Sequence, residues 1–526
     1  MCGIFFDANN KCFTPYSWES FIKSKHRGPD ESRFYTKAIF LGRNATNCSY
    51  GFHRLSITDL TEYGNQPFVM KDGSFCICNG EIYNRDDLAR KYLAEHIFQS
   101  ESDCEILLPL YCKFGENFVK MLDGEFSLIM YLADTKKIII ARDPIGVRPL
   151  YFAETEGHIQ FASELKSLNV DGALHFPPGS YAIIDDLHDT IHPVKYFNLD
   201  ENDSIDDIFI DASKEIRTRL ELAVKKRLSS KVPIGCLLSG GIDSSGIAVL
   251  ASKYSKEPLE TFTCLIEGLE NEDARHAKKV ATLIGSKHHE IKVTLIEVFE
   301  IINKLIYVVE THNMEMIPNL ALIYLVAKYI KENTDVRVIL DGTGPDELLG
   351  GYWFFKHAPD KESFDQETIK QLNDMHKTEL LGDRALASFG LETRYPYLDK
   401  EVVSYIANLP AHYKQCGDGY SGHKPIEKCI LRLALQDVLP ASIVWREKLG
   451  MTHGAGKKFE HLFDEEINCR LDGMKCESQA LSHDRIIGLE GYYKNIFNKY
   501  FPYASNLEIS VTPSYWRIND PLAVWR

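Results

Sequence analysis

The sequence predicts a two-domain protein of the mixed α/β and α+β classes, and three observations support this prediction. A chain of 526 residues is long enough for two or more domains, each with its own core. Beyond residue 208, short apolar runs alternate with stretches of helical periodicity, which indicates a doubly wound parallel sheet. Before residue 190, alternating apolar stretches such as residues 126–131 and 137–140 are typical of strands.

The composition restricts the classes of partner that this chain can bind. It has 44% hydrophobic and 26% charged residues, as ordinary globular proteins do. A net charge of −15 argues against general binding to nucleic acid or to a membrane surface. No apolar run reaches the roughly 18 residues that cross a bilayer, and no signal-peptide pattern opens the chain. Thirteen scattered cysteines predict reduced thiols, and we therefore expect a cytoplasmic protein that binds small molecules.

The first predicted strand follows Cys2, which becomes the terminal residue if Met1 is removed. A free α-amine has a pKa of about 7.7–8.0, so it can act as a base toward the thiol of its own residue. An incidental cysteine near a chain end is the alternative interpretation. However, the apolar residues 4–6 predict a buried strand here and not a loose tail. Cys2 alone leaves the two interpretations equally supported.

A series of motifs after Cys2 resembles the class II glutamine amidotransferase domains. They are residues 1–4, 26–30, 51–60, 79–84, 102–105 and 141–151, in the order in which the family has them. The resemblance implies a glutaminase domain over residues 2–190 with the layered α/β/β/α sandwich of the N-terminal nucleophile hydrolases. It also implies that the Cys2 thiolate attacks the side-chain amide of glutamine.

The resemblance assigns a role to each polar residue of these motifs. The Asn79 side chain and the Gly80 backbone N–H would stabilise the oxyanion, and losing one such donor typically lowers the rate by about 10²–10³. A guanidinium binds a carboxylate bidentately, which suits Arg54 to the α-carboxylate of glutamine. Any one of these charges, taken singly, would be better explained as a solvated surface residue. The implied glutamine-binding set is Arg54, Leu55, Ser56, Ile57, Thr58, Asn79, Gly80, Glu81 and Asp103, with Glu81 and Asp103 for the α-amine.

Residues 185–207 predict a linker and residues 208–228 a helix that leads into the second domain. An apolar strand, residues 234–238, is then followed by S-G-G-x-D-S at residues 239–244 and by a further helix. Glycines allow a tight turn, and the N-terminus of a helix attracts anions. A Gly-Ser turn that merely caps a helix is the alternative. The pattern lacks the P-loop lysine and resembles the pyrophosphate loop of the ATP pyrophosphatases, with Asp243 suited to hold Mg²⁺.

Further strands are predicted at residues 260–266, 288–291 and 336–340, with a helix at 273–284. The pair His288–His289 does not indicate a metal site, because adjacent residues on a strand point to opposite faces. Asp243 and Asp346 each follow the carboxyl end of a predicted strand, where doubly wound sheets bind their ligands. We therefore predict that these two aspartates face the same Mg²⁺–pyrophosphate.

Motifs at residues 389–399, 426–432, 445–448, 490–493 and 516–521 extend the resemblance, nearly end to end, to the glutamine-hydrolysing asparagine synthetases. This resemblance implies a synthetase domain over residues 208–526, in which ATP and Mg²⁺ adenylate the β-carboxylate of aspartate. Ammonia would pass through the protein and displace AMP, and the enzyme would be a homodimer. The residues implied for ATP are Leu237, Ser239, Gly240, Gly241, Asp243, Ser244, Cys264, Asp341, Gly342 and Lys448, with Arg394 as a further cation and Asp243 and Asp346 for Mg²⁺.

Three tracts depart from the family pattern where aspartate and its adenylate would bind. Thr343 stands where the family has an acidic residue, and residues 313–319 and 449–454 also differ. Three hypotheses follow: an asparagine synthetase, a glutamine-dependent adenylating enzyme for another carboxylate, and a catalytically reduced protein that binds glutamine or ATP as a sensor. The presence of Cys2 and Asp243 argues against the third. The amidophosphoribosyl and glucosamine-phosphate enzymes share the first domain, but the pyrophosphate loop excludes them.

Overall fold

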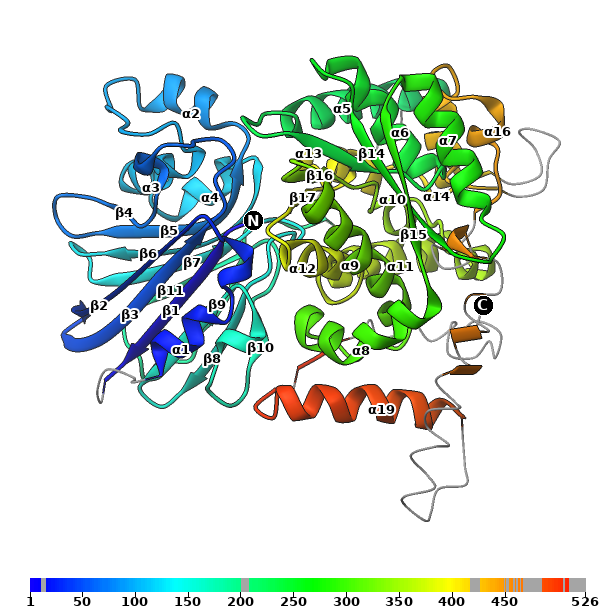
Figure 1. Cartoon of the computed structure of the whole chain (residues 1–526). Coiled ribbons are helices and arrows are strands. Elements are labelled where there is room, and N and C mark those ends of the chain that lie inside the picture. Colours follow the sequence, from blue (N-terminus) through cyan, green and yellow to red (C-terminus); the bar gives the residue numbers. More distant parts are fainter. Residues whose placement is uncertain are drawn as a thin grey trace, which may run out of the picture.

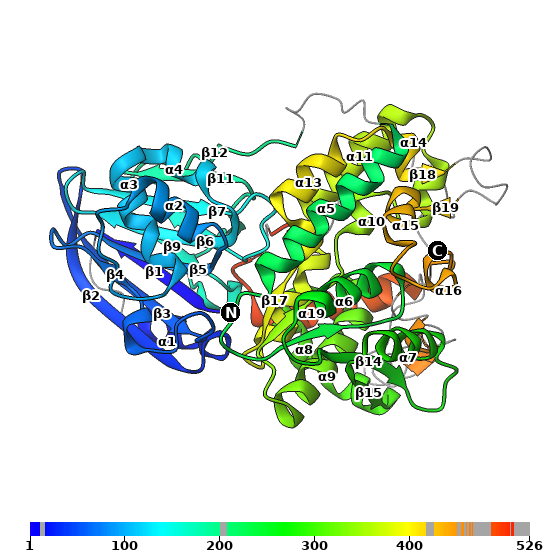
Figure 2. The ribbon, with the colours of Figure 1, turned by 90° about the horizontal axis from the view of Figure 1, so that it is seen from above.

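The computed structural model shows two domains side by side (Figure 1). The first contains the blue and cyan elements and the second the green to red ones. The N-terminus lies at the boundary between them in both views (Figures 1 and 2). The structure describes residues 1–10, 16–199, 208–416, 426–448, 450, 454–456, 459, 462–463, 465–466, 485–504 and 507–509.

The first domain contains two antiparallel six-stranded sheets, ordered β10-β8-β9-β1-β3-β2 and β12-β11-β7-β6-β5-β4. Their strands are β1 (Gly3–Asn9), β2 (Glu31–Leu41), β3 (Asn44–Arg54), β4 (Phe68–Val69), β5 (Phe75–Ile82), β6 (Gly124–Leu132), β7 (Lys137–Arg142), β8 (Tyr151–Thr155), β9 (His158–Ala162), β10 (Leu174–His175), β11 (Ser180–Ile184) and β12 (Val194–Lys195).

The alternation of side chains along each strand builds the layers of this domain. On β1, Ile4 and Phe6 face the core between the two sheets, whereas Phe5 contacts Phe21 of α1 (Ser17–Ile22) on the outer face. Helices α2 (Arg85–Tyr92), α3 (Leu107–Phe114) and α4 (Phe118–Met121) pack on the outer face of the other sheet. The predicted α/β/β/α sandwich is confirmed.

The second domain is built on a parallel five-stranded sheet in the order β15-β14-β13-β16-β17. Its strands are β13 (Ile234–Leu237), β14 (Glu260–Ile266), β15 (Lys287–Val293), β16 (Val338–Leu340) and β17 (Glu392–Arg394). The chain proceeds from β13 outward to β15 and then resumes on the other side of β13 with β16. The topological switch point therefore lies between β13 and β16, where ligands bind beyond the strand ends.

Helices cover both faces of this sheet, which confirms the doubly wound architecture. One face packs mainly against α5, α6, α7, α13 and α15, and the other against α8, α9, α12 and α19. The helices are α5 (Phe209–Arg227), α6 (Ile242–Tyr254), α7 (Glu272–Ile284), α8 (Leu295–Val309), α9 (Met316–Asn333), α10 (Pro345–Leu348), α11 (Lys361–Asp374), α12 (Gly382–Ala387), α13 (Lys400–Ala407), α14 (Ala411–Lys414), α15 (Cys429–Leu435), α16 (Ala441–Val444) and α19 (Arg485–Tyr500). None of the helices formed by the described residues has the length and apolarity of a transmembrane span.

The structure corrects two expectations outside the sites. Part of the predicted linker, residues 194–195, forms β12 and pairs with β11, while residues 200–207 lie outside the described residues. Cys429 is disulfide-bonded, contrary to the prediction of reduced thiols. Scattered spacing could not exclude this bond, because folding can bring together cysteines that are distant in sequence. Eight described cysteines are free, namely Cys2, Cys48, Cys76, Cys78, Cys104, Cys112, Cys236 and Cys264.

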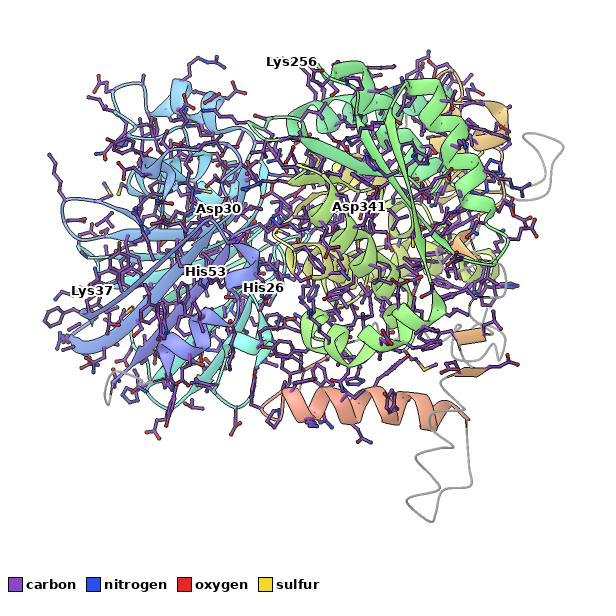
Figure 3. The ribbon with its side chains drawn as sticks, in the orientation of Figure 1. His26, Asp30, Lys37, His53, Lys256 and Asp341 are labelled. Atoms are coloured by element: carbon purple, nitrogen blue, oxygen red, sulfur yellow. The ribbon has the colours of Figure 1, made fainter. Side chains whose placement is uncertain are left out.

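Buried ion pairs join the two domains. Arg27 and Arg148 of the first domain both bind Asp383 of the second, at 3.1 and 3.3 Å. Lys166 binds Glu310 across the same interface at 2.9 Å. A more exposed pair, Asp30 with Arg337 of the second domain, lies at the same boundary, and Figure 3 shows Asp30 on the side of the first domain that faces the second. The residues around Cys2 are therefore enclosed partly by the second domain.

Candidate functional site

The first candidate site surrounds Cys2, directly before β1. The backbone N–H of Cys2 donates to Asn79 Oδ1 at 3.1 Å, and its thiol donates to the Leu55 carbonyl at 3.9 Å. The Nδ2 group of Asn79 is buried and has no hydrogen-bond partner among the described residues. A buried amide donor without a partner, placed beside the thiol, suits an oxyanion. Gly80 follows in β5, and a Cβ there would lie 2.2 Å from the Glu125 carbonyl, so only glycine fits.

The thiol and the chain terminus share a buried environment. Burial raises the pKa of Cys2 to about 11, although the nearby positive N-terminus lowers it. The thiol is therefore neutral near pH 7 and needs a base to become a nucleophile. Met1 is fully buried: its α-amine lies 3.5 Å from Glu392, and its Sδ accepts a hydrogen bond from Arg148 at 2.6 Å. Removal of Met1 would make the nitrogen beside Asn79 the free amine.

The predicted glutamine-binding charges are each held by neighbouring groups. Arg54 donates to the carbonyls of Thr61 and Asp59 at 2.6 and 2.5 Å, which fixes its guanidinium. Asp103 accepts from the Ile82 N–H at 2.5 Å and from the Thr58 hydroxyl at 3.5 Å. Burial raises the pKa of Asp103 to about 6.

The remaining members of this set lie on the same elements. Ser56 donates its N–H to Asp30 at 2.8 Å, and Leu55 and Ile57 pack on Val338 of the second domain. Glu81 is buried near the end of β5. The structure thus brings the nine predicted residues together from the end of β3, the following loop, β5 and the 3₁₀ helix η3 (Asp103–Ile106).

The second candidate site lies at the switch point, where the loops after β13 and β16 meet. The hydroxyls of Ser239 and Ser244 lie 3.0 Å apart at the start of α6. A Cβ on Gly342 would approach the Ser244 N–H to 2.7 Å, so the two loops are in direct contact. Gly240 has φ +77°, and a Cβ there would lie 2.4 Å from the backbone nitrogen of Ala277. Leu237 and Cys264, half-buried, lie near the carboxyl ends of β13 and β14.

Asp243 and Asp346 converge on one cation, the ammonium of Lys428, at 2.5 and 2.7 Å. Lys448 also pairs with Asp346. Burial alone would raise the pKa of Asp346, but Lys428 and Lys448 lower it to about 2. For Asp243, burial outweighs Lys428 and raises the pKa. The Oδ1 atom of Asp243 has no hydrogen-bond partner among the described residues.

This arrangement fits a magnesium ion bound jointly by protein and substrate. Mg²⁺ prefers oxygen ligands and commonly takes one or two carboxylates together with phosphates and water. Asp243 and Asp346 are such a pair at the ends of neighbouring parallel strands. Among the described residues, no group of three or more His, Cys, Asp or Glu side chains could hold a metal ion.

Sequence reasoning gave no role to three residues at this site. Lys428 is fully buried with φ +57°, in the left-handed region, immediately before α15. Glu347 is buried and Glu379 half-buried, and both carboxyls lie near Asp346. Burial and the charge of Glu379 raise the pKa of Glu347 to about 8, and desolvation and Asp346 raise that of Glu379 to about 7. The only signal for Lys428 was its place in the motif at residues 426–432, and the only one for Glu347 was its position next to Asp346. Glu379 had no signal in the sequence.

The structure describes part of the three tracts that depart from the family pattern, namely residue 343 and residues 313–319 and 449–454. Thr343 donates its hydroxyl and its N–H to Asp341 Oδ1 at 2.8 and 2.9 Å, and so closes the loop after β16 without supplying a carboxylate. Asn313 caps the turn into α9 by accepting from the Glu315 N–H at 2.9 Å. Of residues 449–454, only 450 and 454 are described.

The structure contradicts the prediction that Arg394 is a cation for the phosphates or the substrate of the second site. The Arg394 guanidinium binds Glu392, Glu81 and two backbone carbonyls at the domain interface. The sequence alone does not reveal these partners.

Comparisons with known proteins match both halves of the chain. A family model described as a glutamine amidotransferase domain matches residues 1–186, and one described as asparagine synthase matches residues 215–364 and 356–488. The chain is 34% identical to the asparagine synthetase [glutamine-hydrolyzing] of Mus musculus, covering 95% of this chain and 94% of that protein. It is 34% identical to the protein of the same name from Bos taurus, covering 98% and 96%, and 33% identical to that from Homo sapiens, covering 99% and 98%.

Proposed function

The chain belongs to the family of glutamine-hydrolysing asparagine synthetases, and we propose that its two sites perform the two halves of that reaction. Glutamine is hydrolysed in the first domain, and the ammonia is used in the second to convert aspartate to asparagine. The observation that carries this proposal is the convergence of Asp243 and Asp346 on a single cation beside the Ser-Gly-Gly loop. The domain limits 2–190 and 208–526 remain predictions.

In the first half, the Cys2 thiol gives its proton to the α-amine that removal of Met1 frees. The thiolate attacks the side-chain amide of glutamine, and the oxyanion accepts hydrogen bonds from Asn79 Nδ2 and the Gly80 N–H. Arg54 binds the α-carboxylate, while Glu81 and Asp103 bind the α-ammonium. The unpartnered Asn79 amide supports this assignment.

In the second half, the triphosphate of ATP lies against residues 239–244 and the N-terminus of α6. Leu237, Cys264, Asp341 and Gly342 border the nucleotide, and Lys428 and Lys448 supply positive charge near the phosphates. Mg²⁺, when held by Asp243 and Asp346, would neutralise charge on the phosphates. Attachment of AMP turns the aspartate β-carboxylate into an acceptor that ammonia can attack, releasing AMP.

The loop after β16 bears on which acid is the acceptor. Thr343 supplies no carboxylate at the loop after β16, which favours a second candidate in which another acid is adenylated. We also propose the homodimeric state that the family resemblance suggests. The location that we propose is cytoplasmic; eight free thiols among the described residues support it, and the disulfide at Cys429 argues the other way.

The test follows pyrophosphate, AMP and amide formation by the purified full-length protein with glutamine, ATP, Mg²⁺ and a panel of carboxylates. Aspartate-dependent release of pyrophosphate with asparagine formation is expected. Release with another acid alone would select the second candidate, and no release with any acid would select a glutamine- or ATP-binding sensor. Cys2→Ala should lose glutamine use yet retain ammonia use, while Cys112→Ala, at an exposed free thiol, should retain both.

A further inference from the structure

Arg394 of the second domain reaches into the first. It is fully buried at the end of β17, and its Nε donates to Glu392 at 2.8 Å. Its Nη1 donates to the carbonyls of Arg227 and Ser229 at 2.9 and 2.7 Å. These bonds fix the plane of the guanidinium. The remaining nitrogen, Nη2, lies 3.3 Å from Glu81 Oε1 and has no hydrogen-bond partner among the described residues.

Glu81 depends on this cation. Among the described residues, Arg394 is the one group that forms an ion pair with the Glu81 carboxylate. Burial and the neighbouring Asp103 raise the pKa of Glu81 well above its usual value, whereas Arg394 lowers it. Without a nearby cation, two adjacent buried carboxylates tend to hold a proton between them. A protonated pair attracts an ammonium group less strongly than a charged one.

We propose that Arg394 is a positioning residue of the glutamine site, contributed by the synthetase domain. Its guanidinium holds the Glu81 carboxylate in the orientation in which Glu81 and Asp103 accept the α-ammonium of glutamine. This inference rests on the proposal that Glu81 and Asp103 bind that group. The glutamine site is then complete only when the second domain is in place.

The backbone of the same residue supports the other site. Arg394 pairs with Leu340 of β16, and its carbonyl accepts from the Asp341 N–H at 3.0 Å. Asp341 begins the loop proposed to border ATP. Arg394 therefore contacts a residue of each candidate site, one through its side chain and the other through its main chain.

The test measures how strongly the full-length enzyme recognises the α-ammonium group. The kcat/KM for hydrolysis is determined for glutamine and for 4-carbamoylbutanoate, which is glutamine without its α-amine. The ratio of the two values does not depend on the fraction of folded enzyme, because both come from one preparation. We expect Arg394→Met and Glu81→Gln each to lower this ratio by about tenfold, as for loss of a charged hydrogen bond. The double variant should lower it no further than either single one.

Two further variants keep the test decisive. Arg394→Lys retains a positive charge with a single donor group, and an intermediate ratio is expected. Arg384→Met removes another buried arginine of the second domain, which donates to the Val309 carbonyl and lies 3.8 Å from Glu310 at the same interface, and it should keep the wild-type ratio.

Each contrary outcome has a distinct meaning. A wild-type ratio in Arg394→Met and Arg394→Lys, with a lowered ratio in Glu81→Gln, would overturn the role of Arg394 and leave the glutamine site standing. A wild-type ratio in Glu81→Gln would refute the proposed α-ammonium site and the inference with it. An equal fall in Arg384→Met would assign the effect to general damage at the interface and overturn the inference.

Discussion

Asp103 and Asp346 are the same residue type in opposite electrostatic surroundings. Burial raises the pKa of Asp103 to about 6, although hydrogen bonds from backbone N–H groups and the Arg394 charge lower it. Asp346 is also buried, but Lys428 and Lys448 lower its pKa to about 2. Arg394 offsets burial only in part at Asp103, whereas two lysines pair directly with Asp346. The charge on Asp103 is therefore sensitive to pH in a range where Asp346 stays ionised.

We predict that the KM for glutamine rises as the pH falls below about 6, because protonation of Asp103 removes a negative charge that faces the α-ammonium group. Asp103→Asn should have a raised KM at neutral pH and no further step near pH 6. Steady-state glutaminase assays across this range provide the measurement. A wild-type KM that is constant through pH 6 would contradict the prediction.

Residues whose role depends on a local motif could be predicted, and residues whose role depends on a distant partner could not. Cys2, Arg54 and Asp103 could be placed in one candidate site because their motifs occur within one domain, and their roles stay predictions. Lys428 lies 185 residues from Asp243, and no pattern in the sequence joins the two. The surroundings of the Arg394 side chain could not be predicted either, because its partner Glu81 lies across an interface that the sequence does not reveal.

At the scale of elements, the loop of residues 239–244 is in close contact with α7. Gly240 combines φ +77° with a predicted clash of any Cβ against the backbone of His276 and Ala277. Gly268 has φ +81° but no heavy atom within 4 Å of its Cβ position. Comparing the same substitution at these two glycines therefore distinguishes the effect of backbone strain from the effect of steric crowding.

We predict that Gly240→Ala lowers ATP-dependent pyrophosphate release by roughly 10²-fold, because the added methyl group displaces the loop from α7. Gly268→Ala carries only the strain of a left-handed residue, roughly 1–2 kcal/mol, and should keep the wild-type KM for ATP. Pyrophosphate assays and thermal unfolding of both variants provide the comparison. Equal rates of pyrophosphate release in the two variants would refute the role assigned to the contact between Gly240 and α7.

Long periodic elements were predictable, and very short ones were not. The predicted strand at 260–266 coincides with β14, and the predicted helix at 273–284 differs from α7 by one residue. Strands β12 and β17 have two and three residues, too few to show a period. They form because their edges pair with β11 and β16, which is a property of the assembled sheet.

At the scale of the whole molecule, buried charges hold the two domains together. Glu392 binds Arg394 at 2.8 Å and lies near the terminal amine and Arg148. Burial alone would raise the pKa of Glu392, but these cations lower it from 4.5 to about 2. A carboxyl whose pKa is lowered in the folded state stabilises that state above its usual pKa. This stabilisation is lost as the pH falls through 4.5 toward 2.

We predict that Glu392→Gln lowers the thermal unfolding temperature most at neutral pH, and that the gap to the wild type narrows as the pH approaches the folded pKa of about 2. Scanning calorimetry at several pH values provides the measurement. Glu401→Gln, at an exposed carboxylate on α13, serves as the control and should leave a small gap throughout. A difference in unfolding temperature between Glu392→Gln and the wild type that does not vary with pH would contradict the lowered pKa of Glu392.

The burial of Met1 has a consequence for how this enzyme matures. An aminopeptidase needs a free chain end, yet Met1 is enclosed between Arg27, Arg148 and Glu392, the last of which belongs to a domain synthesised much later. If Met1 is removed to free the Cys2 amine, as we propose, its excision must precede the folding of the second domain over the start of the chain. A molecule that escapes processing in that interval would be locked as a proenzyme.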